Sequence, residues 1–474
     1  MRSFLKASGV LLVGAVLVVL YLMRFQGLRI ERDGSGIRPM VSFYKPERHM
    51  ASIEQNRAPA VPEPTTQPVT QPAVSAPEEK PKPKETETSD SGIYWTDFRG
   101  PRRDGTYEEM PILTKWPASG PVRLWRKPLG GGYASFVIAN GNAFTIEQRR
   151  SQEVIAAYDM TNGREVWSHA WDGFFQESMG GDGPRATPTW NGGRIYALGA
   201  AGELRCLDAK TGRRIWSKNI LQDNGAENLQ WGMSAAPLIV DDKVIVLPGG
   251  SGGKSVVAYD KLTGAPRWQA LNDKQSYTSP MLVTLAGERQ ILVVSAQRAV
   301  GLTTDGKLLW EYPWSTSYDI NAGQPVITGP DRFIISAGYG HGAALVRVTK
   351  TGDALTATRV WENTRMKNKF TTSVLYEGYL YGLDEAILAC VNAETGDLKW
   401  KGGRYGYGQV VLASGHLIVL AEDGDVALVR ATPERHDEVA RFSAIEGKTW
   451  NHPAISGGVL LVRNTTEMSA FRLR

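Results

Sequence analysis

Cationic, aromatic and amide side chains recur between residues 148 and 452, in short segments that each lead into an apolar run. Aromatic rings can stack on a planar ligand, and Arg or Lys side chains can pair with its carboxylates. If the fold brings these segments together, they could bind a planar or anionic ligand. The residues that we predict to line this site are Gln148, Arg149, Arg150, Glu177, Asp182, Arg185, Gln230, Trp231, Tyr277, Asn321, Gln324, Lys369, Tyr405, Tyr407, Trp450 and His452.

Three oxygen-bearing side chains in these segments could hold a metal ion. Glu177, Asp319 and Asn321 carry carboxylate or amide oxygens, which are the ligands that Ca²⁺ takes in proteins. Asp319 is also the candidate catalytic base. The alternative is a polar surface filled by water and ion pairs, or a rim that binds protein. We favour this alternative over a cofactor site, because residue types alone do not establish a function.

A tryptophan repeat predicts the fold that positions these segments. One unit, Ala258–Trp268, reads A-x-D-x-x-T-G-x-x-x-W, and related units recur along the chain. Asp and Gly suit a tight turn between two strands, and Trp can fill the wedge between neighbouring sheets. A spacing of 40 to 50 residues with short β runs is typical of propeller blades. The tryptophans of the repeat are Trp125, Trp167, Trp216, Trp268, Trp310, Trp361 and Trp400.

A third element precedes each unit and brings the count of blades to eight. Apolar strands open at Pro188, Pro237, Pro280, Pro325 and Pro453, and three further runs without proline occupy the same place in the repeat. The last set ends at the C-terminus without its Trp strand, and residues 122–126 lie before the first full blade. We therefore predict an all-β, eight-bladed β-propeller over residues 93–474, closed by pairing of the two ends. The segments named above precede the innermost strands, so they should converge on one end of the central channel.

The N-terminal part reads as a membrane tether. Residues 7–23 carry no charge and are near the lower limit for a membrane span. A cleaved signal peptide is the competing interpretation, but no small-x-small cleavage site follows the apolar run. We predict an uncleaved transmembrane anchor at residues 1–24, a juxtamembrane segment at 25–57 and a Pro-rich disordered linker at 58–92. Basic residues on both sides of the apolar run leave its orientation open from charge alone.

Composition excludes several classes of function. A net charge of +5 without a basic block gives no support to nucleic-acid binding. The two cysteines, Cys206 and Cys390, exclude a disulfide scaffold and lie in equivalent positions of different repeats, where we expect small buried apolar side chains. No His-Glu-x-x-His motif occurs, so a zinc site of that spacing is absent from the sequence.

The repeat unit at Ala258–Trp268 resembles that of the quinoprotein (PQQ-type) propellers, and also that of the β-propeller lipoprotein of the outer-membrane protein assembly complex. Residues 95–105 resemble a stretch that opens many bacterial propellers of this kind. The resemblance implies a periplasmic propeller, and in the family's enzymes PQQ is held with a Ca²⁺ ion. This chain lacks the adjacent cysteine pair of many such dehydrogenases and the Cys-x-x-Cys-His motif of a fused haem.

We therefore expect a membrane-anchored, non-catalytic binding or scaffold protein of the cell envelope. Its partner would be an envelope protein or peptide, and its place the inner membrane, with a single span and the propeller in the periplasm. Residues 25–57 could also contact a larger membrane complex. The alternative is a PQQ-dependent oxidoreductase that acts on an alcohol or a sugar, with PQQ and Ca²⁺ as cofactors.

Overall fold

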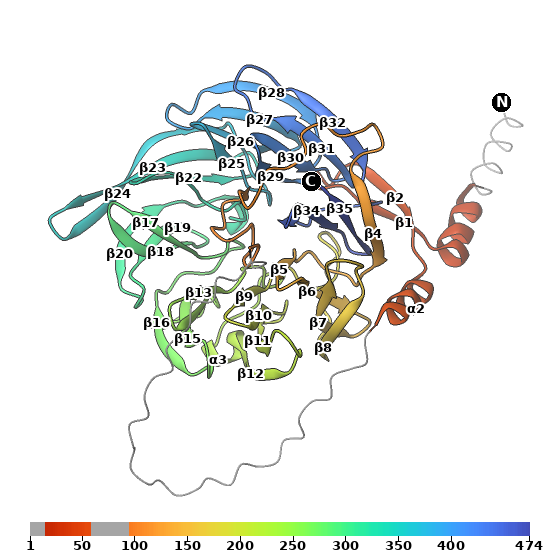
Figure 1. The fold of residues 1–474 in the computed structure, drawn as a ribbon. Coiled ribbons are helices and arrows are strands. Elements are labelled where there is room, and N and C mark those ends of the chain that lie inside the picture. The colour runs from red at the N-terminus through yellow and green to blue at the C-terminus, as the bar shows by residue number, and fades with distance from the viewer. Residues whose placement is uncertain (1–14, 58–93) are drawn as a thin grey trace, which may run out of the picture.

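The computed structural model describes residues 15–57 and 94–474, and residues 94–474 form eight β-sheets arranged around a central axis (Figure 1). Each sheet contains a blade of four antiparallel strands that runs from the axis to the outer edge. The predicted all-β, eight-bladed propeller is confirmed. Blades 1 to 4 consist of β5 (Val137–Ala139), β6 (Asn142–Arg149), β7 (Gln152–Asp159), β8 (Glu165–Asp172); β9 (Thr189–Asn191), β10 (Arg194–Leu198), β11 (Glu203–Asp208), β12 (Arg214–Asn219); β13 (Leu238–Val240), β14 (Lys243–Val246), β15 (Val256–Asp260), β16 (Pro266–Ala270); and β17 (Met281–Leu285), β18 (Glu288–Val294), β19 (Arg298–Leu302), β20 (Leu308–Pro313).

The remaining blades follow the same order, and short helices occur only in connections. Blades 5 to 8 consist of β21 (Val326–Gly329), β22 (Arg332–Ala337), β23 (Gly342–Thr351), β24 (Ala354–Asn363); β25 (Val374–Tyr376), β26 (Tyr379–Asp384), β27 (Ile387–Asn392), β28 (Leu398–Arg404); β29 (Gln409–Ala413), β30 (His416–Leu420), β31 (Asp425–Arg430), β32 (Glu438–Ser443); and β33 (Ala454–Ser456), β34 (Val459–Arg463), β35 (Glu467–Arg472), β4 (Val122–Pro128). The connecting helices are α3 (Ile220–Asn224) and η2 (Ser317–Asp319).

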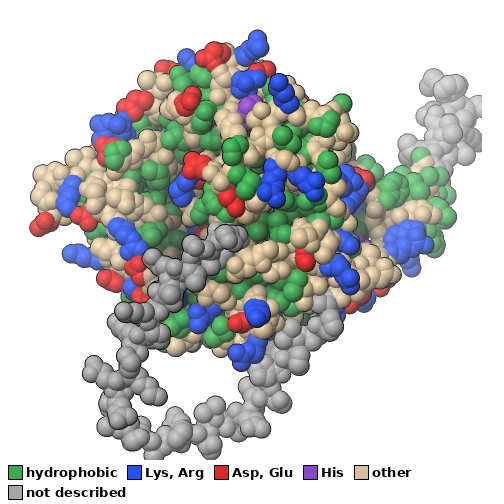
Figure 2. Space-filling view, in the orientation of Figure 1, with side chains coloured by type: hydrophobic (Ala, Val, Ile, Leu, Met, Phe, Trp, Pro, Cys, Tyr) green, Lys and Arg blue, Asp and Glu red, His purple; other side chains and the backbone are tan. Residues whose placement is uncertain are grey.

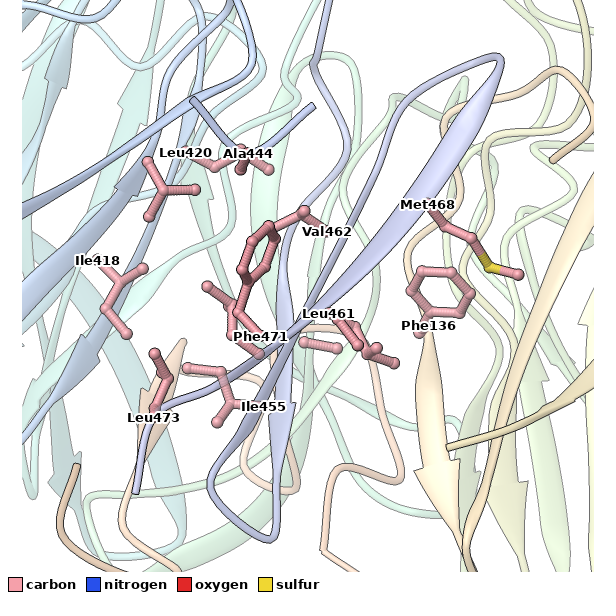
Figure 3. Packing of buried hydrophobic residues seen from close by; sticks show 14 of the residues in the cluster. Phe136, Ile418, Leu420, Ala444, Ile455, Leu461, Val462, Met468, Phe471 and Leu473 are labelled. Atoms are coloured by element: carbon pink, nitrogen blue, oxygen red, sulfur yellow. The ribbon is translucent and has the colours of Figure 1, made fainter. Parts of the chain in front are cut away.

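Blade 8 closes the ring with strands from both ends of the propeller. β4 pairs antiparallel with the C-terminal β35, and Trp125 lies opposite Ala470. The predicted closure is therefore confirmed. The largest group of buried apolar side chains lies at this junction, where Phe471 and Leu461 of blade 8 pack near Phe136 of blade 1 (Figure 3). Because strands from both ends of the propeller pair within one blade, the ring has no open end.

Neighbouring blades are joined by a tryptophan that packs on the glycine of the next blade's turn. A methyl carbon added at Gly212 would lie 2.5 Å from Cε3 of Trp167 in the preceding blade, and Trp167 Nε1 donates to Ala209 O at 3.1 Å. The same contact and hydrogen bond join Trp125 to the turn at Gly163, Trp216 to that at Gly264, Trp268 to that at Gly306 and Trp361 to that at Gly396. The wedge-filling role predicted for the repeat's tryptophan is confirmed by this geometry.

The central channel is filled by the chain that precedes the propeller. Residues 94–107, which we call the plug, cross the axis of the ring (Figure 1). Trp95 O accepts from Ile138 N of blade 1 at 2.7 Å, and β3 (Thr106–Tyr107) pairs in parallel with β29 of blade 7. Within the plug, Arg103 is buried and donates to three carbonyl oxygens from blades 3 and 4, at Ala236, Pro237 and Pro280.

The described N-terminal residues lie against the propeller. A short π-helix η1 (Leu22–Gln26) leads into a hairpin of β1 (Leu28–Arg32) and β2 (Pro39–Phe43), followed by helix α2 (Pro46–Asn56). The helix contacts the closing blade, where His49 Nε2 lies 2.9 Å from Leu129 O, and also blade 1, where Asn56 Nδ2 donates to Gly163 O at 3.1 Å. Figure 2 shows apolar side chains on the described part of the N-terminal helical segment, which stands out from the disc.

No helix within residues 15–57 and 94–474 combines the length and apolar character needed to cross a bilayer. Residues 1–14 of the predicted anchor and the predicted linker at 58–92 lie outside the described residues. Cys206 and Cys390 are both free and buried, and burial raises the pKa of each thiol to about 12.

The Trp–Gly contact can be tested by adding one methyl group at Gly212. Gly212→Ala should lower the free energy of unfolding by about 2–5 kcal/mol, since Ala at φ +71° costs about 1–2 kcal/mol and overlap with Trp167 adds a further 1–3 kcal/mol. The control is Gly141→Ala, at φ +73° with no atom within 4 Å of the added carbon. This variant should show only the cost of the positive φ. Urea unfolding monitored by Trp fluorescence measures both, and equal losses would contradict the proposed role of the contact.

Candidate functional site

The mouth of the channel is built from two kinds of connection. In each blade the segment before the first strand and the loop between the second and third strands lie at the same end, because successive strands run antiparallel. Above the plug, these connections bring together a set of rings and cations, which we call the mouth belt. It consists of Tyr133, Phe175, Arg185, Tyr339, Lys369, Phe370, Tyr407, Lys448 and Trp450.

The rings of the belt contact one another across blades. Trp450 stacks on Tyr133 with ring centres 5.4 Å apart, and Phe370 lies 4.7 Å from Trp450 and 5.6 Å from Tyr407. These separations are within the range of favourable aromatic pairs. Four blades thus contribute one continuous aromatic surface. A separate pair, Trp231 and Tyr277, has ring centres 5.6 Å apart.

Three cations lie over these rings. Arg185 lies 5.4 Å from the centre of Tyr133 and 4.8 Å from that of Phe175, Lys448 lies 4.4 Å from Trp450, and Lys369 lies 4.9 Å from Tyr407. Burial lowers the pKa of all three side chains, because water is replaced by rings and backbone. The ring faces partly compensate by cation–π attraction. A surface of this kind favours acidic or carbonyl-rich ligands with flat apolar parts.

A buried carboxylate completes the belt. Glu422 accepts a hydrogen bond from Trp450 Nε1 at 2.7 Å and one from Tyr407 N at 3.2 Å. It also accepts from the tip of the β1–β2 hairpin, which lies on the belt at this point. The mouth is therefore covered in part by the chain's own N-terminal segment.

The structure places several predicted site residues inside blades instead of at the mouth. The Arg149 guanidinium is buried against the carboxylates of Glu147 and Glu165, and this pairing raises its pKa well above its ordinary value despite the cost of burial. The Tyr405 hydroxyl donates to Glu438 of the outer strand β32. Long side chains at strand ends can turn back into the blade, and sequence position does not reveal this direction.

Two predicted amides are also structural. Gln148 donates to three backbone carbonyls within blade 1, at Arg150, Gln152 and Gly173. The Gln324 amide faces both backbone groups of Ser279, with which it can form hydrogen bonds of 2.7 and 2.9 Å. Arg150, Asp182 and Gln230 are exposed, and Arg150 pairs with Glu47 of α2 at 3.8 Å.

The two carboxylates among the candidate metal ligands are each engaged separately. Asp319 pairs with Lys274 at 3.1 Å, and Glu177 accepts from the backbone N–H groups of Met179 and Gly180. Asn321 is buried and donates through Nδ2 to Ser295 O and Ala296 O, while its Oδ1 has no hydrogen-bond partner in the structure. Across the described residues, no group of three or more His, Cys, Asp or Glu side chains could hold a metal ion. The proposed Ca²⁺ ligands therefore do not fit a Ca²⁺–PQQ site, and we derive no chemistry from them.

His452 lies beside the plug and beneath the mouth belt. It is buried, with its ring 6.5 Å from Trp95 and 5.7 Å from Phe98. Burial and the positive charge of Arg99 lower the pKa of His452 from 6.5 to about 3. The ring is therefore neutral at physiological pH and packs as part of the core.

Sequence reasoning missed Tyr133, Tyr339 and Glu422. Tyr133 follows three glycines ahead of the first strand of blade 1, and the other two follow the second strand of their blades. For Tyr339 and Glu422 a topological signal could have revealed them, because loops after second strands open at the same end as the segments before first strands. Tyr133 lies in a segment before a first strand, the kind in which we predicted the site, and was missed there.

The comparisons with known proteins agree with this architecture. A family model described as outer membrane protein assembly factor BamB matches residues 150–402, more than half of the chain. The chain belongs to this family. It is 22% identical over 334 residues to BamB of Burkholderia pseudomallei (strain K96243), with 66% of this chain and 78% of that protein covered. The crystal structure of BamB from Moraxella catarrhalis superposes with a TM-score of 0.54 at 17% identity, covering 74% of this chain and 99% of that one, which shows a shared fold.

The sequence similarity to quinoproteins is more local. The chain is 31% identical over 124 residues to quinohemoprotein alcohol dehydrogenase ADH-IIG of Pseudomonas putida, which covers 24% of this chain. It spans about one sixth of that dehydrogenase, 16% of its length. The predicted resemblance to quinoprotein propellers and to the assembly-complex propeller is thus confirmed.

The buried, neutral state of His452 predicts a pH dependence of stability. As the pH falls from about 6.5 to about 3, the unfolded chain binds a proton at this position and the folded chain does not, so stability falls by up to about 1.4 kcal/mol per pH unit. His452→Gln should remove this part of the slope. Urea midpoints at pH 7, 5 and 4 measure it, and parallel pH profiles for the two proteins would contradict the prediction.

Proposed function

We propose that this member of the BamB family is a non-catalytic binding or scaffold protein of the cell envelope. Residues 1–24 would anchor it in the inner membrane, and the propeller would lie in the periplasm. The observation that carries the proposal is the mouth belt, a continuous surface of rings and cations with a plug beneath it. Such a surface suits recognition of a polypeptide, because aromatic and Arg side chains are enriched at protein interfaces.

The family supports this proposal. BamB of B. pseudomallei is by name an outer membrane protein assembly factor, and its similarity extends over two thirds of the present chain. Partners of this chain would accordingly be envelope proteins or peptides. A net charge of +5, without a basic block, gives no support for nucleic acid as a ligand.

A second candidate is a PQQ-dependent oxidoreductase that acts on an alcohol or sugar. The similarity to ADH-IIG and the flat aromatic surface beside Lys369, Lys448 and Arg185 favour it. The separate engagement of the Glu177 and Asp319 carboxylates argues against it. We therefore place it second.

A partner at the mouth should be captured by photo-crosslinking in native membranes. With p-benzoylphenylalanine at Tyr318 or Met179, which are 81% and 66% exposed beside the mouth, the full chain should fractionate with membranes and crosslink to one envelope protein. The same group at Leu262, 48% exposed in a turn at the opposite end, should give no such product. Crosslinks only from Leu262, or none from any position, would contradict a partner at the mouth.

The enzymatic alternative predicts cofactor binding. Calorimetric titration of the full chain with PQQ, with and without Ca²⁺, should show no saturable binding up to high micromolar PQQ if the protein is a scaffold. One-to-one binding that is lost in Asp319→Asn, and that supports dye-linked alcohol oxidation, would replace our proposal by the oxidoreductase.

A further inference from the structure

The tip of the β1–β2 hairpin contacts the mouth through one residue of its own, Gly34. Gly34 is buried, although it lies at the turn of a hairpin whose strands are mostly exposed. Its N–H donates to Glu422 Oε1 at 2.5 Å, and its carbonyl oxygen accepts from Lys369 Nζ at 2.6 Å. Both polar groups of one peptide residue are thus satisfied by two oppositely charged side chains from different blades.

The belt leaves no room for a side chain at this residue. A methyl carbon added at Gly34 would lie 2.3 Å from Cδ2 of Tyr407, and the Tyr407 ring is itself packed against Phe370. Tyr407 is buried, so its ring cannot move aside without disturbing the belt. Gly34 does not have a positive φ, so close approach, not backbone conformation, requires glycine here.

The turn that presents Gly34 is preformed by its own residues. Asp33 Oδ1 accepts hydrogen bonds from the N–H groups of Ser35 and Arg38, at 3.1 and 3.2 Å, and Asp33 O accepts from Gly36 N at 2.9 Å. Burial would raise the pKa of Asp33, but these hydrogen bonds outweigh it and the pKa lies below its ordinary value. The carboxylate is therefore ionised and adds to the attraction of Lys369.

The rest of the hairpin packs loosely. Ile30, Val41 and Phe43 are 52%, 63% and 65% exposed, and two strands alone are at best marginally stable in water. A cavity of about 970 Å³ lies between the hairpin, α2 and the closing blade, and another of about 520 Å³ lies beyond the turn, against blades 6 and 7. The tip is the tightly fitted part, so its contacts decide whether the hairpin stays on the mouth.

We propose that the mouth is a recognition site for an acidic glycine turn of a polypeptide, read by Glu422, Lys369 and Tyr407, and that residues 33–38 occupy it within this chain. This deepens, and rests on, the proposed function as a binding scaffold. A partner's turn of the same chemistry has to displace the hairpin, which competes at an effective concentration on the order of millimolar because it is tethered. The hairpin therefore sets a threshold of affinity for partners.

The test uses full-length variants and a labelled peptide of residues 28–43. Gly34→Ala should release the hairpin, so that backbone amides of residues 28–43 exchange at least tenfold faster than in the parent chain. The matched control is Ile37→Ala, which removes a side chain that is 83% exposed at the same tip and should leave exchange unchanged. Equal exchange in the parent and Gly34→Ala chains would overturn the proposal.

The released mouth should then bind the peptide in trans. By fluorescence anisotropy, the Gly34→Ala chain should bind the peptide at least tenfold more tightly than the parent chain does, and adding Lys369→Met should weaken binding at least tenfold. A peptide carrying Gly34→Ala should not compete. Failure of the released chain to bind, or equal binding of both peptides, would overturn glycine-turn recognition. Persistent crosslinks from Tyr318 in that case would show that the scaffold function stands without it.

Discussion

The rest of the structure is built on a contact that recurs between blades, in which a repeat tryptophan packs on the glycine of the next blade's turn. A propeller has wedge-shaped gaps between its blades, and where this pair occurs a large flat ring on a residue without a Cβ closes the gap at the outer edge. The indole N–H adds a hydrogen bond to a carbonyl of the neighbouring blade, so the contact sets the distance and the rotation between blades. Five inter-blade junctions use the same pair. Once they are in place, the positions of the inner strands follow.

Fixed inner strands allow the channel to be closed from within. The plug reaches the inner strands of opposite blades, and Arg103 satisfies carbonyl oxygens that begin two adjacent blades. A guanidinium carries enough donors to join several acceptors at once, which a smaller side chain could not do. The plug and His452 fill the channel below the mouth. The mouth belt therefore lies on packed side chains and does not surround an open pore.

The belt and the N-terminal hairpin illustrate how recognition can be built from backbone chemistry. Every peptide unit has one donor and one acceptor, and Glu422 and Lys369 supply the complementary groups for Gly34. Discrimination comes from Tyr407, whose ring excludes any Cβ. The cations remain poorly hydrated among rings, which strengthens their interaction with a carbonyl or carboxylate. These features bring together residues of blades 6, 7 and 8 and a segment more than 300 residues away in the chain.

The fold class, the eight blades and the closure by residues 122–126 could be predicted from the sequence, because each rests on a local pattern of Trp, Gly and Pro repeated along the chain. The sequence also located the segments that reach the mouth, and Arg185, Lys369, Tyr407 and Trp450 do lie together there. Other features are visible only in the folded chain: Arg149 and Tyr405 turn into their blades, residues 94–107 fill the channel, and Gly34 contacts Glu422. Side-chain direction and contacts between distant segments depend on packing in three dimensions, which no local pattern records.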